Sequence, residues 1–177
     1  MEDPFSGLAE RYLATSGALR GVVCHALVAK QLDEYLPQPP ARIADVGGGA
    51  GHQAIPLARK GYEVTILDPS GTMLREARRI LTSEEESVRR RVRLVEGSGE
   101  RAHEILDEGW FEVVLCHGVL PYIEDSYPLI QALASVACTG AVVSVLTKKP
   151  PRWPCAPLSK GVTGKPVGEP PTSIWLA

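Results

Sequence analysis

Apolar and polar positions along this chain follow two different periods. Between residues 18 and 36 apolar side chains recur every three or four positions, which predicts an amphipathic helix preceded by Ser16 as its N-cap. The stretch "PQPP" at 37–40 ends this helix and leads into the first strand. From residue 41 onward, short continuous apolar runs alternate with helical patterns.

These runs predict a regular series of strands and helices. The "ARIADVGG" run is continuously apolar, as a strand buried on both faces requires. Helix ends carry their own signals: Ser70 and Pro128 at starts, and Gly61 as a left-handed cap. Strands are expected at 41–48, 62–69, 91–98, 111–120 and 141–149, and helices at 52–60, 70–81, 100–108 and 128–137.

Strands that alternate with helices form βαβ units and a parallel sheet. The fold class predicted is therefore α/β, a Rossmann-like doubly wound, mainly parallel sheet of about five strands. We divide the chain into an N-terminal helical segment and linker (1–40), one domain (41–149) and a tail (150–177). The tail has seven prolines and three glycines in 28 residues, so we expect no regular structure in it.

Composition narrows the function classes. A net charge of −2 gives no overall field toward nucleic acid, and 44% apolar with 23% charged residues is typical of a soluble globular protein. Seven arginines nevertheless crowd one region, and we interpret them as a solvated helix face and loop in preference to an RNA contact. They are Arg75, Arg78, Arg79, Arg89, Arg90, Arg91 and Arg93.

The sequence lacks the signals of a secreted, a membrane-spanning or a metal-binding protein. The acidic start lacks the layout of a secretory signal, and no apolar run approaches the length of a membrane span, so we expect a cytoplasmic protein. The histidines and cysteines show no metal-ligand spacing, and we expect no metal site. The cysteines, Cys24, Cys116, Cys138 and Cys155, are expected to be small buried residues.

The segment "RIADVGGGAG" suggests a ligand. Gly47, Gly49 and Gly51, with Gly48 among them, leave bare backbone at the end of the first strand, where doubly wound sheets bind ligands. No lysine follows, which excludes a nucleoside triphosphate loop. A dinucleotide loop would place a glycine where His52 stands. The spacing therefore favours S-adenosylmethionine.

Asp68 ends the second strand, about twenty residues after the loop. A carboxylate there can accept hydrogen bonds from both ribose hydroxyls. It serves a nicotinamide ribose equally well, so it indicates a nucleoside without naming the cofactor. A helix cap at Asp68 and a plain tight turn at the glycines are the structural alternatives.

At this point the residues resemble a known group. The segment "DVGGGAGHQAIPLARKGYEVTILDPSGTMLREAR" resembles the first two motifs of class I S-adenosylmethionine-dependent methyltransferases. Within them, "YLATSGALRGVV", "VEGSGERA" and "LCHGVLPYIED" are similar to the bacterial tRNA methyltransferases that esterify 5-carboxymethoxyuridine at the wobble position. The resemblance covers residues 7–149.

The resemblance also implies roles for individual residues. Arg20 would hold the methionyl carboxylate, Gly99 and Glu100 would flank the adenine, and His117 would face the methionine moiety. A surface charge at Arg20 and a core histidine at His117 remain alternatives. The full set of candidate cofactor-binding residues is Arg20, Asp45, Gly47, Gly48, Gly49, Gly51, Asp68, Pro69, Met73, Gly99, Glu100 and His117. No catalytic residue is assigned.

The resemblance stops at Lys149, before the two strands that usually finish this fold. The strand at 141–149 would then present a bare apolar edge, which predicts pairing with another chain. The acceptor stays open between tRNA wobble uridine and a small molecule. A shortened, weakly active or inactive cofactor-binding module and a nicotinamide-dependent oxidoreductase are the competing functions.

Overall fold

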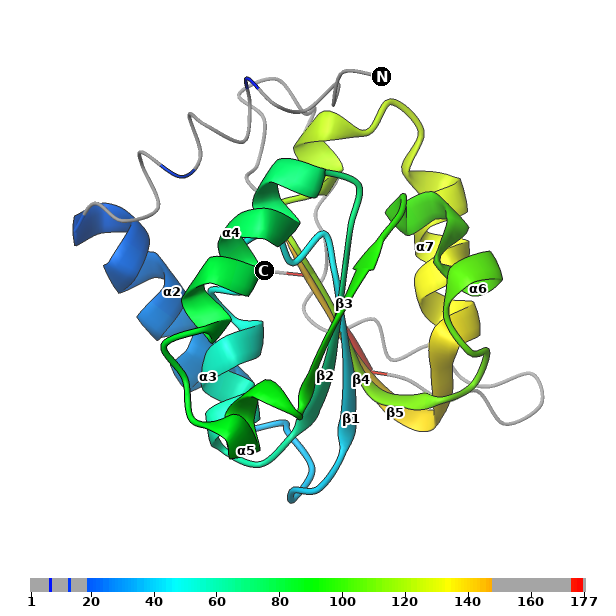
Figure 1. The fold of residues 1–177 in the computed structure, drawn as a ribbon. Coiled ribbons are helices and arrows are strands. Elements are labelled where there is room, and N and C mark those ends of the chain that lie inside the picture. The colour runs from blue at the N-terminus through cyan, green and yellow to red at the C-terminus, as the bar shows by residue number, and fades with distance from the viewer. Residues whose placement is uncertain (1–6, 8–12, 14–18, 148–172, 177) are drawn as a thin grey trace.

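A computed structural model of the chain describes residues 7, 13, 19–147 and 173–176. One parallel sheet runs through it with helices on both faces (Figure 1). The strands are β1 (Arg42–Val46), β2 (Glu63–Asp68), β3 (Val92–Glu96), β4 (Phe111–His117), β5 (Ala137–Leu146) and β6 (Ser173–Leu176). The helices are α2 (Leu19–Leu32), α3 (Ala54–Arg59), α4 (Gly71–Leu81), α5 (Glu86–Arg89), α6 (Ala102–Ile105) and α7 (Ser126–Val136), with 3-10 turns η1 (Gly99–Arg101) and η2 (Leu120–Tyr122).

The strand order is β3-β2-β1-β4-β5-β6. Successive strands step outward from β1 through β2 to β3, and the chain then crosses back so that β4 pairs with the other side of β1. Strand order therefore reverses between β1 and β4, and this is the position at which open α/β sheets bind ligands. The doubly wound fold predicted from the sequence is confirmed.

Two apolar layers hold the helices on the sheet. On one face, α2, α3, α4 and α5 cover the strands, and on the other lie α6 and α7 (Figure 1). Leu115 and Ile66 point into the first layer, whereas Val114 and Leu129 belong to the second, and all four are fully buried. Burying one such side chain contributes about 1.5–3 kcal/mol, so these layers supply the main stabilisation.

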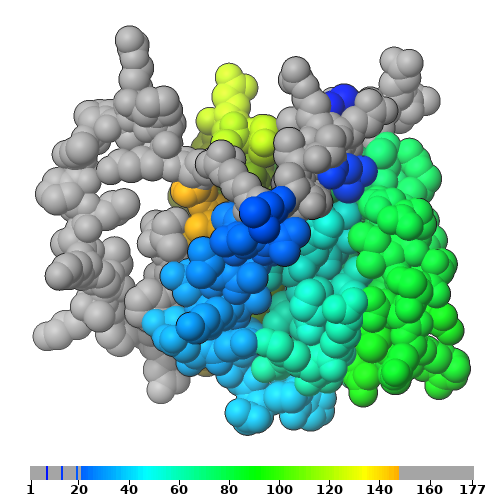
Figure 2. Space-filling model, turned by 90° about the vertical axis from the view of Figure 1, so that its left-hand side faces the viewer, coloured from blue at the N-terminus to red at the C-terminus, as the bar shows by residue number. Residues whose placement is uncertain are grey.

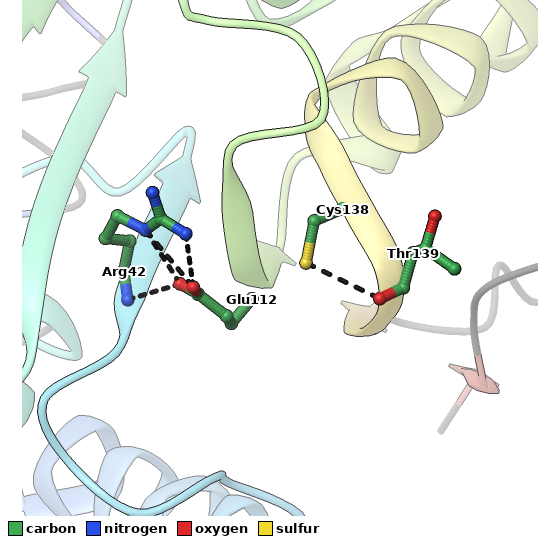
Figure 3. Close-up of polar contacts among 4 residues, drawn as sticks. All are labelled: Arg42, Glu112, Cys138 and Thr139. Atoms are coloured by element: carbon green, nitrogen blue, oxygen red, sulfur yellow. Dashed lines mark hydrogen bonds and ion pairs between the residues drawn. The ribbon is translucent and has the colours of Figure 1, made fainter.

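An ion pair joins the amino ends of β1 and β4. The guanidinium of Arg42 contacts both carboxylate oxygens of Glu112, and the Arg42 backbone amide donates a further hydrogen bond of 2.7 Å to the same carboxylate (Figure 3). The Trp110 ring lies over the same guanidinium, 3.8 Å from its carbon to the ring centroid. Arg42 therefore fixes the start of β1 at the edge opposite the glycine loop.

The structure corrects several expectations near β5. This strand begins at Ala137, four residues earlier than predicted, because Ala137 already pairs with Phe111 across an irregular step in the register. Gly140 lies in that step with φ +81°, a conformation that favours glycine. Helix α5 was not predicted, since its four residues are too few to show a period.

The prediction of an irregular tail is wrong at its end. Residues 173–176 form β6, which pairs in parallel with Val142–Val145 of β5. Ile174, Trp175 and Leu176 have high strand propensity, and the β5 edge offers them unpaired backbone groups. The β5 edge is thus not bare, and the argument for pairing with a second chain loses its basis. The remaining tail residues, 148–172 and 177, lie outside the described residues.

Two further points concern the cysteines and membranes. Cys116 is buried as expected and Cys138 is partly buried, but Cys24 on α2 is exposed. Cys155 lies outside the described residues. Across the part of the chain that the structure describes, none of the helices has the length and apolar content to cross a membrane.

Candidate functional site

The glycine loop follows β1 at the carboxyl edge of the sheet. Gly47, Gly49 and Gly51 have φ values of +75°, +54° and +80°, which side chains with a β-carbon rarely adopt. The Gly47 amide donates a 2.7 Å hydrogen bond to the Leu67 carbonyl, and the Gly51 amide donates one of 2.9 Å to the Gly48 carbonyl. The loop is therefore a fixed turn held against β2.

Side chains pack closely over two of these glycines. A β-carbon at Gly47 would lie 2.2 Å from a methyl group of Val119, and one at Gly49 would lie 2.6 Å from the Met73 methyl. Glycine at these positions thus serves packing within the protein as well as backbone conformation. Val119, in the loop after β4, was not predicted as a site residue, although it lies in the segment "HGVL" that carried the resemblance.

Asp68 is the link between the loop and α4. Its side chain is buried, with Oδ2 accepting a 2.9 Å hydrogen bond from the Gly49 amide and Oδ1 accepting one of 2.9 Å from the Ser70 amide. Ser70 in turn caps α4 by accepting from the Met73 amide at 3.4 Å. Asp68 therefore does help to cap helix α4, which was the structural alternative to a ligand-binding role. A carboxylate has about four acceptor positions, so it can serve more partners than these two amides.

A second carboxylate lies beneath the loop. Asp45 is 3% exposed, and its Oδ2 has no hydrogen-bond partner among the described residues. A β-carbon at Gly48 would lie 2.6 Å from that oxygen, so the missing side chain makes room for it. Burial raises the pKa of Asp45 to about 7, and the negative charge of Asp68 adds to the effect.

His117 ends β4 on the other side of the reversal point. Its Nε2 lies 2.9 Å from the Ser144 hydroxyl of β5, while its buried Nδ1 has no partner within the described part of the chain. Burial, with a smaller contribution from the charge of nearby His25, lowers the pKa of this imidazole to about 4, so the ring is neutral at pH 7. One nitrogen of this buried ring therefore has hydrogen-bonding capacity that the described residues do not use.

Helix α2 reaches the same edge. The rings of His25 and His52 lie with centroids 5.0 Å apart, and the Gln53 amide nitrogen donates to the His25 carbonyl at 3.3 Å. Burial lowers the pKa of both rings. Sequence reasoning missed His25 and Gln53, because nothing in a helical pattern signals a contact with a loop 28 residues away. Arg20 lies on this helix, but its side chain is outside the described residues.

The turn after β3 closes the site on its far side. Gly99 packs so tightly that a β-carbon there would lie 2.7 Å from Val46 and 2.9 Å from Leu129. The Ser98 hydroxyl donates a 2.8 Å hydrogen bond to the Glu100 carboxylate. Pro69 is partly buried beside Asp68. The structure thus brings the predicted residues, apart from the Arg20 side chain, to one edge of the sheet.

The site does not have the features of a metal centre. Despite the three neighbouring histidines, no group of three or more histidine, cysteine or acidic side chains in the described ranges could hold a metal ion. Two cavities occur elsewhere: one of about 400 Å³ between α4, α5 and β3, and one of about 270 Å³ beside Glu112 and Cys138 at the opposite edge of the sheet. The arrangement at the loop can bind a polar ligand through amides and carboxylates.

Comparison with known proteins shows which family this chain resembles. A family described as a methyltransferase domain matches residues 43–140. The tRNA 5-carboxymethoxyuridine methyltransferase of Escherichia coli K12 is 29% identical over 147 residues, covering 80% of this chain and 55% of the relative. The ubiquinone biosynthesis O-methyltransferase of Xanthomonas campestris pv. campestris is 32% identical over 148 residues, covering 82% and 59%.

Solved structures share the fold. The glycopeptide N-methyltransferase MtfA complexed with S-adenosyl-L-methionine superposes with a TM-score of 0.57 at 22% identity, over 64% of this chain and 50% of that one. The geranyl diphosphate C-methyltransferase of Streptomyces coelicolor A3(2) gives 0.57 at 18% identity, over 66% and 41%. The chain spans between half and two thirds of the length of the two curated relatives.

Proposed function

The chain belongs to the methyltransferase domain family, and we propose that it is a methyltransferase that uses S-adenosylmethionine as its methyl donor. The observation that carries this proposal is the buried hydrogen bond between the Gly49 amide and Asp68, which joins the two predicted halves of the site inside the matched segment. Family membership favours this donor over the nicotinamide dinucleotide that Asp68 alone would also suit.

The residues fit this donor by their chemistry. A carboxylate accepts more than two hydrogen bonds, so Asp68 would also accept from the ribose hydroxyls, and the two amides already hold it in place. Pro69 would pack beside the adenosine, with Gly99 and Glu100 along the adenine. Gly47 and Gly48 would lie along the amino acid part and ribose.

Three side chains could bind the charged amino acid part of the donor. Arg20 would pair with its carboxylate, since a guanidinium is always charged and forked. The unpartnered Oδ2 of Asp45 suits a cationic group, whose charge would favour the ionised carboxylate. The free Nδ1 of His117 would contact the methionine portion.

S-adenosylmethionine supplies a methyl group on a sulfonium, which is already a good leaving group. The chain's task is therefore to align the acceptor with that methyl and to exclude water. A carboxylate acceptor is ionised at pH 7 and needs no general base. The site can thus work without a dedicated nucleophile, in keeping with the lack of an assigned catalytic residue.

The relatives' names suggest two acceptor classes: tRNA carboxymethoxyuridine, or a small molecule such as an O-methylation substrate. With tRNA as the acceptor, we would place the reaction at the wobble uridine and the protein in the cytoplasm. A cofactor-binding module with weak or absent transfer is the second candidate.

Calorimetric titration with S-adenosylmethionine and S-adenosylhomocysteine, with transfer of labelled methyl to total tRNA, tests these proposals. Binding with transfer to tRNA supports the enzyme and its acceptor. Binding without transfer to tRNA or to a panel of small acceptors indicates the module. Absence of binding contradicts the proposed function.

A further inference from the structure

The segment from Gly71 to Arg93 is positively charged in an otherwise acidic chain. It contains seven arginines and four glutamates, a net charge of +3, whereas the whole chain has −2. A local surplus of this kind matters only if the structure gathers it on one surface and leaves it without acidic partners.

Three of the four glutamates form ion pairs with arginines. Glu76 is bound by Arg79, Glu84 by Arg59 and Glu86 by Arg90. The other five arginines of the segment form no ion pair with any described residue. These five, Arg75, Arg78, Arg89, Arg91 and Arg93, are called the arginine surface below.

A cavity lies within the arginine surface. It measures about 400 Å³, and its lining includes Arg78 from α4 and Arg89 from α5, two guanidinium groups from different helices. Leu81, Val92 and Leu94 add an apolar floor, and Thr82 also lines it. Arginine side chains suit phosphate oxygens, and apolar lining residues suit the sugar or base that phosphate connects.

The arginine surface extends away from the glycine loop. Helix α4 begins at Gly71, three residues after Asp68, and its 11 residues span about 16 Å. Arg75 lies near its first turn and Arg78 one turn further, followed by the cavity and Arg89. In Figure 2 the green residues of this region run down the right-hand side of the molecule. Charges spread over such a length exceed what one small anion contacts.

In place of the solvated face expected from the sequence, we propose that the arginine surface binds the phosphodiester backbone of the RNA that carries the methyl acceptor. The inference rests on the proposed function, and it chooses RNA between the two acceptor classes. An RNA lying along α4 would reach the carboxyl edge of the sheet, from which a splayed base would extend past the donor's ribose toward its methyl group. An acidic peptide is the competing partner, but it offers neither sugar nor base to the apolar floor.

The test is titration of fluorescently labelled tRNA with the full chain, followed by anisotropy at several salt concentrations. The double variant Arg78→Gln/Arg89→Gln should bind about tenfold or more weakly at 100 mM salt. Its slope of log affinity against log salt should be smaller by about 2, one for each lost phosphate contact. The matched control Lys60→Gln/Arg101→Gln makes the same charge change at ion-paired, exposed cations outside this surface and should bind as the unaltered chain does.

Two parallel measurements separate the possible failures. Calorimetry with S-adenosylmethionine on the same samples should give the same affinity for all three proteins; absent binding to the unaltered chain would contradict the proposed function alone. Unchanged tRNA affinity in the double variant, or equal weakening in the control, would overturn the arginine surface. If the unaltered chain binds a labelled polyglutamate peptide and does not bind tRNA, RNA is not the partner of the arginine surface.

Discussion

The backbone amide of Gly49 donates a 2.9 Å hydrogen bond to Oδ2 of Asp68, so the loop after β1 is tied to the end of β2. The other Asp68 oxygen accepts from the Ser70 amide and starts α4. One buried carboxylate therefore fixes two turns of the site at once. A ligand that uses Asp68 meets a group already held in place, which lowers the ordering cost of binding.

Asp68→Asn should weaken binding of S-adenosylmethionine. The amide keeps one acceptor for a backbone N–H but loses the charge, and the hydrogen bonds to ribose are worth about 1.5–3 kcal/mol when the acceptor is charged. We expect affinity to fall by about ten- to a hundredfold in calorimetry. The exposed Asp107→Asn is the control and should bind normally. Unchanged affinity in Asp68→Asn would place the ribose elsewhere.

Gly49→Ala should lower the free energy of unfolding by about 2–3 kcal/mol. A left-handed conformation costs an alanine about 1–2 kcal/mol, and the new methyl would press on the buried Met73 methyl for about 1 kcal/mol more. Gly109→Ala is the matched control, because Gly109 has φ +60° with nothing within 4 Å of its β-carbon position. Urea denaturation of both variants measures the difference. Equal losses would mean that Met73 yields freely.

Asp45→Asn should stabilise the protein at pH 8 more than at pH 5. The pKa of Asp45 rises from 3.8 to about 7 on folding, so its contribution to stability is greatest below pH 4 and is lost as the pH rises to 7. The neutral amide avoids this loss, which is at most about 4 kcal/mol. Urea denaturation between pH 5 and 8 measures the gain. A gain independent of pH would show that Asp45 is ionised throughout.

Glu112→Gln should destabilise the protein at pH 7 by about 1 kcal/mol, a small value because solvent screens this partly exposed pair. Arg42 holds the pKa of Glu112 at about 2, below its ordinary 4.5. The stabilisation is therefore complete above pH 4.5 and is lost as the pH falls toward 2. Denaturation curves of the two proteins should converge over that range. A constant difference would mean that the hydrogen bonds, and not the charge, stabilise this corner.

Local signals explain why much of the fold could be predicted. The cap at Ser70 and the left-handed Gly61 involve only neighbouring residues, so sequence alone places them. The irregular start of β5 and strand β6 could not be found this way, because both depend on pairing with a strand distant along the chain. Arg42 and Glu112 likewise meet only because β1 and β4 are adjacent.

By itself, the sequence determined the parallel α/β layout, the glycine loop and the acid at the end of the second strand, because period and spacing along the chain encode them. Only the tertiary structure decided that Asp68 holds the loop, that Val119 and Met73 cover its glycines, and that His25 approaches His117. Those contacts join separate elements. Their geometry is set by how the sheet and helices pack, which no local pattern records.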